Sequence, residues 1–176
     1  ARAAPDGVQG ESIKVHGKWT LEVRDPNGTI VSRRIFQNSL KAGGQFLLSA
    51  ILARNVTTTA WKIIVDSPTG QEVCDQSGSP SVTCEITEPG GGASPGFSYD
   101  TLVVTGDSGF FVTDKLVLSG SVVATYDGVV DQVETKLFFI TPGPSSSSVT
   151  FTDRSIVPES VSAGQTVGVT VEITFS

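Results

Sequence analysis

The single histidine is the first residue to consider, because histidine is the side chain that most often does acid–base chemistry near neutral pH. His16 lies between Lys14 and Lys18, in a stretch where apolar and polar residues alternate, and it falls on the polar side. No second histidine is present to complete a metal site or a catalytic triad. The pattern predicts an exposed histidine on a strand.

Residues 92–96, GASPG, match the G-x-S-x-G pattern that presents a nucleophilic serine in α/β-hydrolases. In that fold the residue after the serine donates its backbone N–H to the oxyanion hole, and Pro95 has no N–H. The histidine should also follow the serine, whereas His16 precedes it. A glycosidase-type carboxylate pair stays open, but nothing groups the scattered Asp and Glu residues. We therefore expect no catalytic residue and no enzyme.

Oxygen ligands that could hold calcium occur in the DPNGT segment and at three scattered acidic residues, namely Asp66, Glu72 and Asp75. Neither set has the spacing of an EF-hand loop. Residues 25–28, DPNG, are instead a strong turn sequence. We expect turns at these positions, with no metal and no cofactor.

The two cysteines, Cys74 and Cys84, lie on either side of a turn rich in Gly, Ser and Pro. This placement predicts a local disulfide, and so short a closed loop would stabilise the fold by about 2–3 kcal/mol. A pair of free thiols is the alternative. A zinc site is disfavoured because the spacing exceeds C-x-x-C and no histidine is near.

The chain starts ARAAPDG and contains no methionine. We interpret this as a mature N-terminus left by removal of a secretory signal, with a piece cut from a longer chain as the alternative. A disulfide agrees with an oxidising compartment, so a secreted, cell-surface location is predicted. The sequons at Asn27 and Asn55 would be glycosylated only in a host that modifies exported chains.

Composition favours one β-rich domain. The chain has 176 residues, 17% of them charged, and a net charge of −6. Nucleic acid is a poor partner for such a surface, since there is no basic run. No apolar stretch approaches the roughly 20 residues that span a bilayer, so no membrane insertion is expected.

Residues 114–140 are predicted to form a central β-hairpin, because Asp127 and Gly128 both tolerate the positive φ of a tight turn. In that register Tyr126 faces Val129, and each step outward keeps the pairing. One face is then mostly apolar and the other largely polar, as expected for a sheet that covers a core on one side.

The N-terminal third predicts two strands and a helix. Strict alternation over residues 13–24 indicates a strand of about a dozen residues, which is long compared with the usual five or six. A second strand over residues 29–38 is ambiguous, because either Ile30 with Phe36 or Val31 with Ile35 could face inward. Residues 41–55 have helical periodicity, strongest from Gly44, with their apolar positions at Leu47, Leu48, Ile51 and Leu52. This helix is expected to cover one end of a sandwich, since it lacks the basic face of a membrane-binding segment.

Shorter strands are expected at residues 61–66, 101–106 and 149–153, and the clearest alternation of all occurs at residues 166–175. The fold class predicted is mainly β, an antiparallel β-sandwich of Ig-like or jelly-roll style with one short α-helix. We expect the chain to form a single domain over residues 13–176, preceded by an extended N-terminal segment over residues 1–12.

The opening KVHGKWTLEVRDPNGTIVSRRIFQNSL, residues 14–40, and the GGQFLLSAILARN helix after it resemble a group of uncharacterised exported bacterial proteins. These share a KVHGxWxxxVRxPxGxxV opening. The resemblance covers about the first third of the chain, implies secretion and a single domain, and transfers no catalytic residue. The layout is also similar to β-sandwich subunits of extracellular filaments, in which an N-terminal extension completes a neighbour's sheet.

These features suggest assembly. The strand at residues 166–175 has one charge and no proline, and residues 13–17 are expected to extend beyond the domain's own sheet, so both are predicted to offer unprotected edges. We hypothesise a structural subunit of a pilus-like extracellular filament, a homopolymer joined by strand exchange or edge-strand pairing. The interface is predicted in residues 1 to about 17, at Ala1, Ala4, Val8, Ile13 and Val15.

Two alternatives remain. One is a monomeric extracellular module that binds a glycan or a surface receptor, and the other is a virion or phage-tail component. Sugar-binding modules usually present several exposed aromatic side chains. Trp19 and Trp61 lie within apolar strand patterns and are predicted to be in the core.

Overall fold

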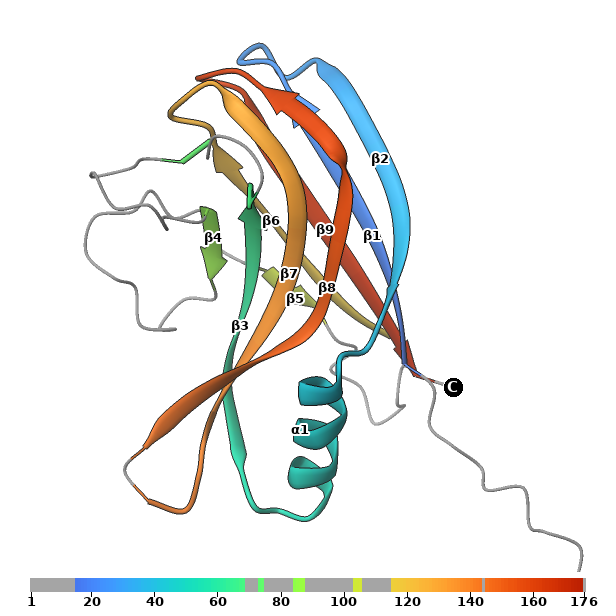
Figure 1. Ribbon diagram of the computed structural model, residues 1–176, viewed down its shortest axis with the longest axis vertical. Coiled ribbons are helices and arrows are strands. Elements are labelled where there is room, and N and C mark those ends of the chain that lie inside the picture. The colour runs from blue at the N-terminus through green and yellow to red at the C-terminus, as the bar shows by residue number, and fades with distance from the viewer. Residues whose placement is uncertain are drawn as a thin grey trace, which may run out of the picture.

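The computed structural model describes residues 15–68, 73–74, 84–87, 103–105, 115–143 and 145–175. It confirms the predicted class: two antiparallel sheets face each other, with one α-helix at the end where the β7–β8 hairpin projects (Figure 1). The five-stranded first sheet has the order β2-β1-β9-β6-β5, formed by β1 Val15–Arg24, β2 Ile30–Ser39, β5 Val103–Thr105, β6 Lys115–Val123 and β9 Thr166–Phe175. The four-stranded second sheet has the order β4-β3-β7-β8, formed by β3 Thr57–Asp66, β4 Cys84–Thr87, β7 Gly128–Ile140 and β8 Ser146–Val161. Helix α1 spans Ala42–Leu52.

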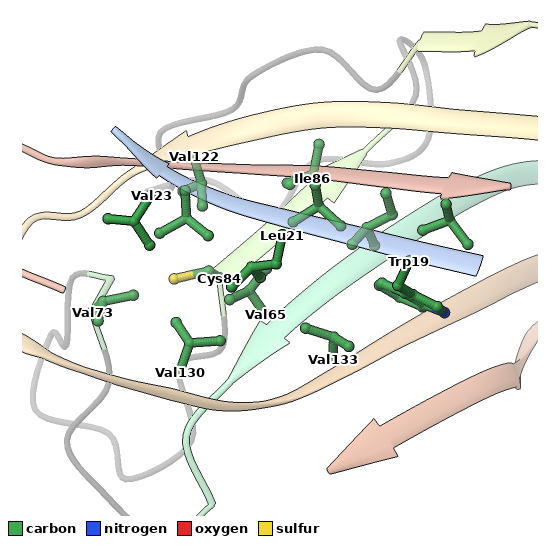
Figure 2. Close-up of a cluster of buried hydrophobic side chains, with 14 of the residues drawn as sticks. Trp19, Leu21, Val23, Val65, Val73, Cys84, Ile86, Val122, Val130 and Val133 are labelled. Carbon is green, nitrogen blue, oxygen red and sulfur yellow. The ribbon is translucent and has the colours of Figure 1, made fainter. Parts of the chain in front are cut away.

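Alternation along β1 builds one half of the core. Trp19, Leu21 and Val23 are buried, while the residues between them face outward. Figure 2 shows these side chains opposite Val65 and Val133 of the second sheet. Each fully buried side chain of this size contributes about 1.5–3 kcal/mol of hydrophobic stabilisation. The inward residues of β1 are those expected from the sequence, and His16 is exposed as expected.

The final strand has the predicted bounds but not the predicted position. β9 lies between β1 and β6, so it is a central strand and offers no edge. β1 is also central, and its leading residues pair on both sides, with Val15 opposite Phe175 and Gly17 opposite Asn38. The expectation that residues 15–17 extend beyond the sheet is therefore wrong. Alternation with a period of two shows on which face of a sheet a side chain lies, but it does not show which strands are neighbours in that sheet.

The predicted hairpin over residues 114–140 is also wrong. β6 pairs with β5 and β9, whereas β7 pairs with β3 and β8 in the other sheet. The apolar faces of β6 and β7 cover the core from opposite sides instead of lying side by side. The segment between them crosses from one sheet to the other, and Asp127 Oδ1 accepts a hydrogen bond from the backbone N–H of Ala163 at 2.8 Å.

Strand β8 is much longer than the short strand expected at residues 149–153, because it runs from Ser146 to Val161 and includes the end of the serine run. Ser146 to Ser148 pair with Ile140 to Phe138 of β7. Small polar residues have low β-propensity, but a backbone ladder does not require large side chains.

In β2 the structure favours Phe36 as the inward residue, but Ile30, which was expected to face inward with it, is 44% exposed beyond the register shift between Val23 and Arg24. Phe36 is half-buried against the main core and stacks on Trp19, with ring centroids 6.0 Å apart. Ile35 points outward and is 56% exposed. Helix α1 is confirmed with slightly shorter bounds, and Leu47 is its buried anchor against Leu137 and Phe139.

The predicted disulfide is confirmed. Cys74 and Cys84 are bonded, their Cα atoms are 5.4 Å apart, and both residues are buried. The bond ties Cys74 to the first residue of the short edge strand β4.

Reduction of this disulfide should lower the free energy of unfolding by about 2–3 kcal/mol, because the intact bond closes a short loop and so restricts the unfolded chain. The measurement is urea denaturation with and without reductant, and the matched variant is Cys74→Ser/Cys84→Ser. Reductant should have no further effect on that variant. Equal midpoints for the oxidised and reduced wild-type protein would contradict this expectation.

Candidate functional site

The residues that could have done chemistry have structural roles or lie outside the described ranges. The DPNG segment forms the β1–β2 turn, in which Asn27 Oδ1 accepts a hydrogen bond from Thr29 N at 2.9 Å. The side chain of Asp25 accepts another from Gln165 at 2.7 Å. Residues 92–96, Glu72 and Asp75 are outside the described residues.

Within the described ranges, no three His, Cys, Asp or Glu residues are grouped as metal ligands would be. In the same part of the chain, no helix is long and apolar enough to cross a membrane.

The two sheets have four edge strands of very different length. β4 and β5, on one side of the sandwich, have four and three residues. β2 and β8, on the other side, have ten and sixteen. Very short edge strands are one of the ways in which proteins avoid unwanted pairing. The long edges β2 and β8 run side by side along one margin (Figure 1), so this margin is the candidate interface.

β2 and β8 touch at two points and are separate between them. At one end an isolated antiparallel bridge joins Leu40 to Thr152. Toward the other end the side chain of Arg34 forms an ion pair with Glu159, which is buried. Among the described residues, no ladder connects the two strands between these points. The margin is therefore closed at both ends and open in the middle.

The open part is a groove of about 360 Å³, which we call the β2–β8 groove. Its walls are three successive residues of β2 and four of β8, namely Arg34, Ile35, Phe36, Arg154, Ser155, Ile156 and Val157. Side chains of successive strand residues point to opposite faces. If the groove lay on one face of a sheet, only every second residue would line it. Because successive residues of both strands line it, the groove runs along the backbone edges of β2 and β8.

The groove combines apolar and cationic side chains. Phe36 and Ile156 are half-buried and pack against the main core, while Ile35 and Val157 are exposed. The side chain of Arg154 is exposed and forms no hydrogen bond or ion pair with any other described residue. An extended segment with small apolar residues and some negative charge would complement these walls.

The remainder of the β8 edge is protected by other means. Below the groove, helix α1 covers it: Lys41 N donates to Phe151 O at 3.0 Å, and Lys41 Nζ pairs with Asp153 at 2.7 Å. Gly44 lies so close that a Cβ there would be 2.8 Å from Phe151 O. Toward the upper end of the groove β8 is irregular, because its register with β7 shifts between Ser155 and Glu159, and Pro158 in this stretch cannot donate to a ladder. The groove residues Arg154 to Val157 therefore lie between the part of β8 that α1 covers and Pro158.

Two buried polar groups lie on the inner side of β1 and β2. Neither Trp19 Nε1 nor the carboxamide of Asn38 has a hydrogen-bond partner among the described residues. A β-carbon placed on Gly17 would be 2.2 Å from Asn38 Oδ1, so this side chain packs directly on the first strand. Buried polar groups usually have partners, and this end of the core lacks them.

A second surface feature lies on the outer face of the first sheet. It is a polar hollow of about 380 Å³, lined by Thr20, Glu22, Arg24, Arg33, Ser119, Gly120, Gly168, Val169, Thr170 and Glu172. Glu22 forms ion pairs with both Arg24 and Arg33. Its charged groups are therefore largely paired with one another, and the hollow has the character of a solvated sheet face.

At the margin of this hollow, the hydrogen bond from Lys115 to Glu172, 2.7 Å long, is the main reason that the pKa of Glu172 is lowered. Desolvation opposes the shift, and the charges of Lys115 and Lys18 add to it. The pair joins β6 to β9, which explains how the one charge of β9 is accommodated on a central strand.

Lys115→Met should raise the pKa of Glu172 toward its ordinary value, which carboxyl NMR titration would measure. Because the folded-state pKa is lowered, the pair stabilises the fold above the unfolded pKa, and this contribution is lost as pH falls through the folded pKa. The stability difference between wild type and variant should therefore disappear in acid. An unchanged titration of Glu172 would contradict the assignment.

Of the predicted interface residues, Ala1, Ala4, Val8 and Ile13 lie outside the described ranges. Val15 is the first residue of β1 and packs against the main core. Sequence analysis missed the groove, although a signal was present: β2 has apolar residues on both faces, which made its inward side ambiguous.

Comparison with protein-family models, with curated proteins and with solved structures finds no match for this chain. The resemblance of its opening to exported bacterial proteins stays a prediction, and functional interpretation depends on the β2–β8 groove.

Proposed function

We propose that this protein is a structural subunit of an extracellular, pilus-like filament, in which copies are joined by strand exchange or edge-strand pairing. The observation that carries the proposal is the β2–β8 groove, where two long strands leave backbone edges without a strand partner. Such edges can add an extended segment from another chain through main-chain hydrogen bonds. Of the other described edges, β4 and β5 are short, and α1 covers part of the β8 edge.

The disulfide supports an extracellular setting. Disulfides persist in oxidising compartments and are rare in the cytosol. Cys74 and Cys84 are bonded and buried, as expected for a structural bond. A filament outside the cell would gain from a subunit stabilised in this way.

The alternative of a glycan-binding module has less support. The exposed aromatic residues of the described part are Phe46 on α1 and Tyr126 in the β6–β7 connection. They lie on different elements and form no stacking platform of the kind that sugars use. The polar hollow on the first sheet contains no aromatic residue.

The test is assembly of the full chain over a concentration series, followed by sizing chromatography and negative-stain microscopy. We expect filaments for the wild type. Val157→Lys places a charge at the open edge, a device by which natural edge strands prevent pairing, and should prevent assembly. Val157 is 67% exposed, so the domain should remain folded.

The matched control is Val123→Lys, since Val123 is 45% exposed at the end of β6, outside the groove. This variant should assemble like the wild type. A wild-type chain that stays monomeric at high concentration, or retention of the chain on polysaccharides, would contradict the proposal.

A further inference from the structure

We infer that the β2–β8 groove of one copy binds residues 63–114 of the next copy, which we call the acidic stretch. This stretch includes the two short edge strands, β4 and β5. The inference rests on the proposed function and names the partner surface of its interface. Charged side chains would select the partner and orient it.

Charge is distributed very unevenly along the chain. The acidic stretch contains eight Asp and Glu residues and no Lys or Arg, whereas the other 124 residues contain ten acidic and twelve basic side chains. The net charge of −6 therefore comes from the acidic stretch, which carries −8 while the remainder carries +2. A protein with charge separated in this way attracts copies of itself wherever the two parts can meet.

The fold places edges from the two parts on opposite sides of the sandwich. β4 and β5 are edge strands on one side, and β2 and β8 are the edges on the other (Figure 1). Of the described acidic residues, Glu85 is on β4, and Asp66 is at the end of β3, the strand that pairs with β4. In contrast, β2 contains Arg33 and Arg34 and no acidic residue, and β8 adds Arg154 to the groove.

Arg154 is the charge that the groove leaves for a partner. The two arginines of β2 form ion pairs within the same copy, one with Glu22 and the other with Glu159. The exposed side chain of Arg154 has no such partner among the described residues. A carboxylate from a neighbouring copy would pair with it, and a guanidinium–carboxylate contact fixes orientation as well as adding affinity.

The backbone of β8 favours contact through side chains at this place. Its register with β7 shifts between Ser155 and Glu159, so this part of β8 does not present a regular ladder edge. Ile35 and Val157 are exposed in the same groove and give the contact an apolar centre beside the charge. An apolar centre with polar groups at its rim is the usual composition of a protein–protein interface.

The positions of the two edges favour a second copy over the same chain. The first sheet has five strands, so β2 and β5 are separated by four strand spacings, or about 19 Å. The acidic stretch begins within β3 and ends just before β6, so it would have to cross this width and return to reach its own groove. A copy placed alongside meets the groove directly. Because two different surfaces meet, the contact is head-to-tail and generates a polymer.

Zero-length cross-linking of the full chain tests the contact. Arg154→Lys keeps the positive charge and introduces an amine, which a carbodiimide joins to a carboxylate only when the two groups touch. An equal mixture of unlabelled and 15N-labelled chains, assembled and then treated, identifies links between copies by mass spectrometry. We expect mixed-isotope links from position 154 to Asp or Glu residues of the acidic stretch. The native pair of Lys41 and Asp153 provides the reference link within one chain.

Ser148→Lys is the matched control, since Ser148 is exposed on β8 but lies outside the groove. It should give no mixed-isotope link to the acidic stretch. If filaments form while position 154 links to acidic residues elsewhere, or to none, the inference fails and the filament proposal stands. Links confined to single chains would show that the groove is filled in cis, which also overturns the inference. A full chain that stays monomeric contradicts both.

Charge reversal gives an independent measurement. Arg154→Glu should raise the concentration at which assembly begins by at least about tenfold, because attraction to the acidic stretch becomes repulsion. Ser148→Glu adds negative charge on the same strand outside the groove, and it should leave that concentration within about twofold of the wild type. Salt at about 1 M, which shortens the screening length to about 3 Å, should reduce the difference between the two variants. Equal assembly of the two variants in low salt would overturn the inference.

Discussion

Replacing Trp19 with alanine is expected to lower the free energy of unfolding by about 3–5 kcal/mol, the usual cost of removing a large buried aromatic side chain. Trp19 is on the central strand β1 of the first sheet, its side chain is 0% exposed, and it points into the core between the two sheets (Figure 2). It also stacks on Phe36, one of the walls of the β2–β8 groove. The variant should therefore lose stability and also the support on which the groove depends. Urea denaturation followed by circular dichroism measures the first effect.

Phe46→Ala is the matched control, because it removes an aromatic side chain that is 68% exposed on α1. Its cost should stay within about 0.5 kcal/mol, as for most surface substitutions. If the Trp19→Ala variant unfolds at the same urea concentration as this control, the assignment of Trp19 to the centre of the core is wrong.

The inward faces of the strands could be predicted from the sequence because burial follows a local rule. Side chains alternate along a strand, so Trp19 was placed correctly from its neighbours alone. Helical periodicity, which is also a local pattern, placed Leu47 on the buried side of α1. These assignments require only the chain's own periodicity, and no knowledge of which strands are neighbours.

The order of the strands could not be predicted in this way. β6 and β7 have matching apolar faces whether they pair side by side or cover the core from opposite sheets. The Asp127-Gly128 pair favoured the hairpin, yet the crossing between sheets uses Asp127 to accept a hydrogen bond from Ala163, thirty-six residues further along. Contacts of such long range are not encoded in a local pattern. For the same reason β9 was mistaken for an edge.

The groove depends on that lateral order and so was not predicted directly. What the sequence did contain was a strand with no clear inward side, since Ile35 and Phe36 are adjacent and both apolar. In the structure Phe36 belongs to the core and Ile35 is exposed beside the unpaired edge. A strand that is apolar on both faces and is not central is a useful indication of an interface.

Replacing Leu47 with alanine is the second large effect that we expect, with a loss of about 2–5 kcal/mol in the free energy of unfolding. Leu47 is 0% exposed and anchors α1 on Leu137 and Phe139. The control is Leu52→Ala in the same helix, where the side chain is 74% exposed. Leucine and alanine have similar helix propensities, so the control should change stability by only about 0.2–0.5 kcal/mol.

This substitution should also change how copies associate, because α1 covers the β8 edge below the groove. With its anchor removed, the helix would no longer hold Lys41 on Phe151 and Asp153, and the unpaired edge would lengthen beyond Arg154 to Val157. Longer open edges pair without a fixed register, so irregular aggregates should replace regular filaments. Light scattering and negative-stain microscopy, at a urea concentration where both variants are still folded, measure this outcome. Filaments of Leu47→Ala that are as regular as those of Leu52→Ala would show that the helix does not limit the edge.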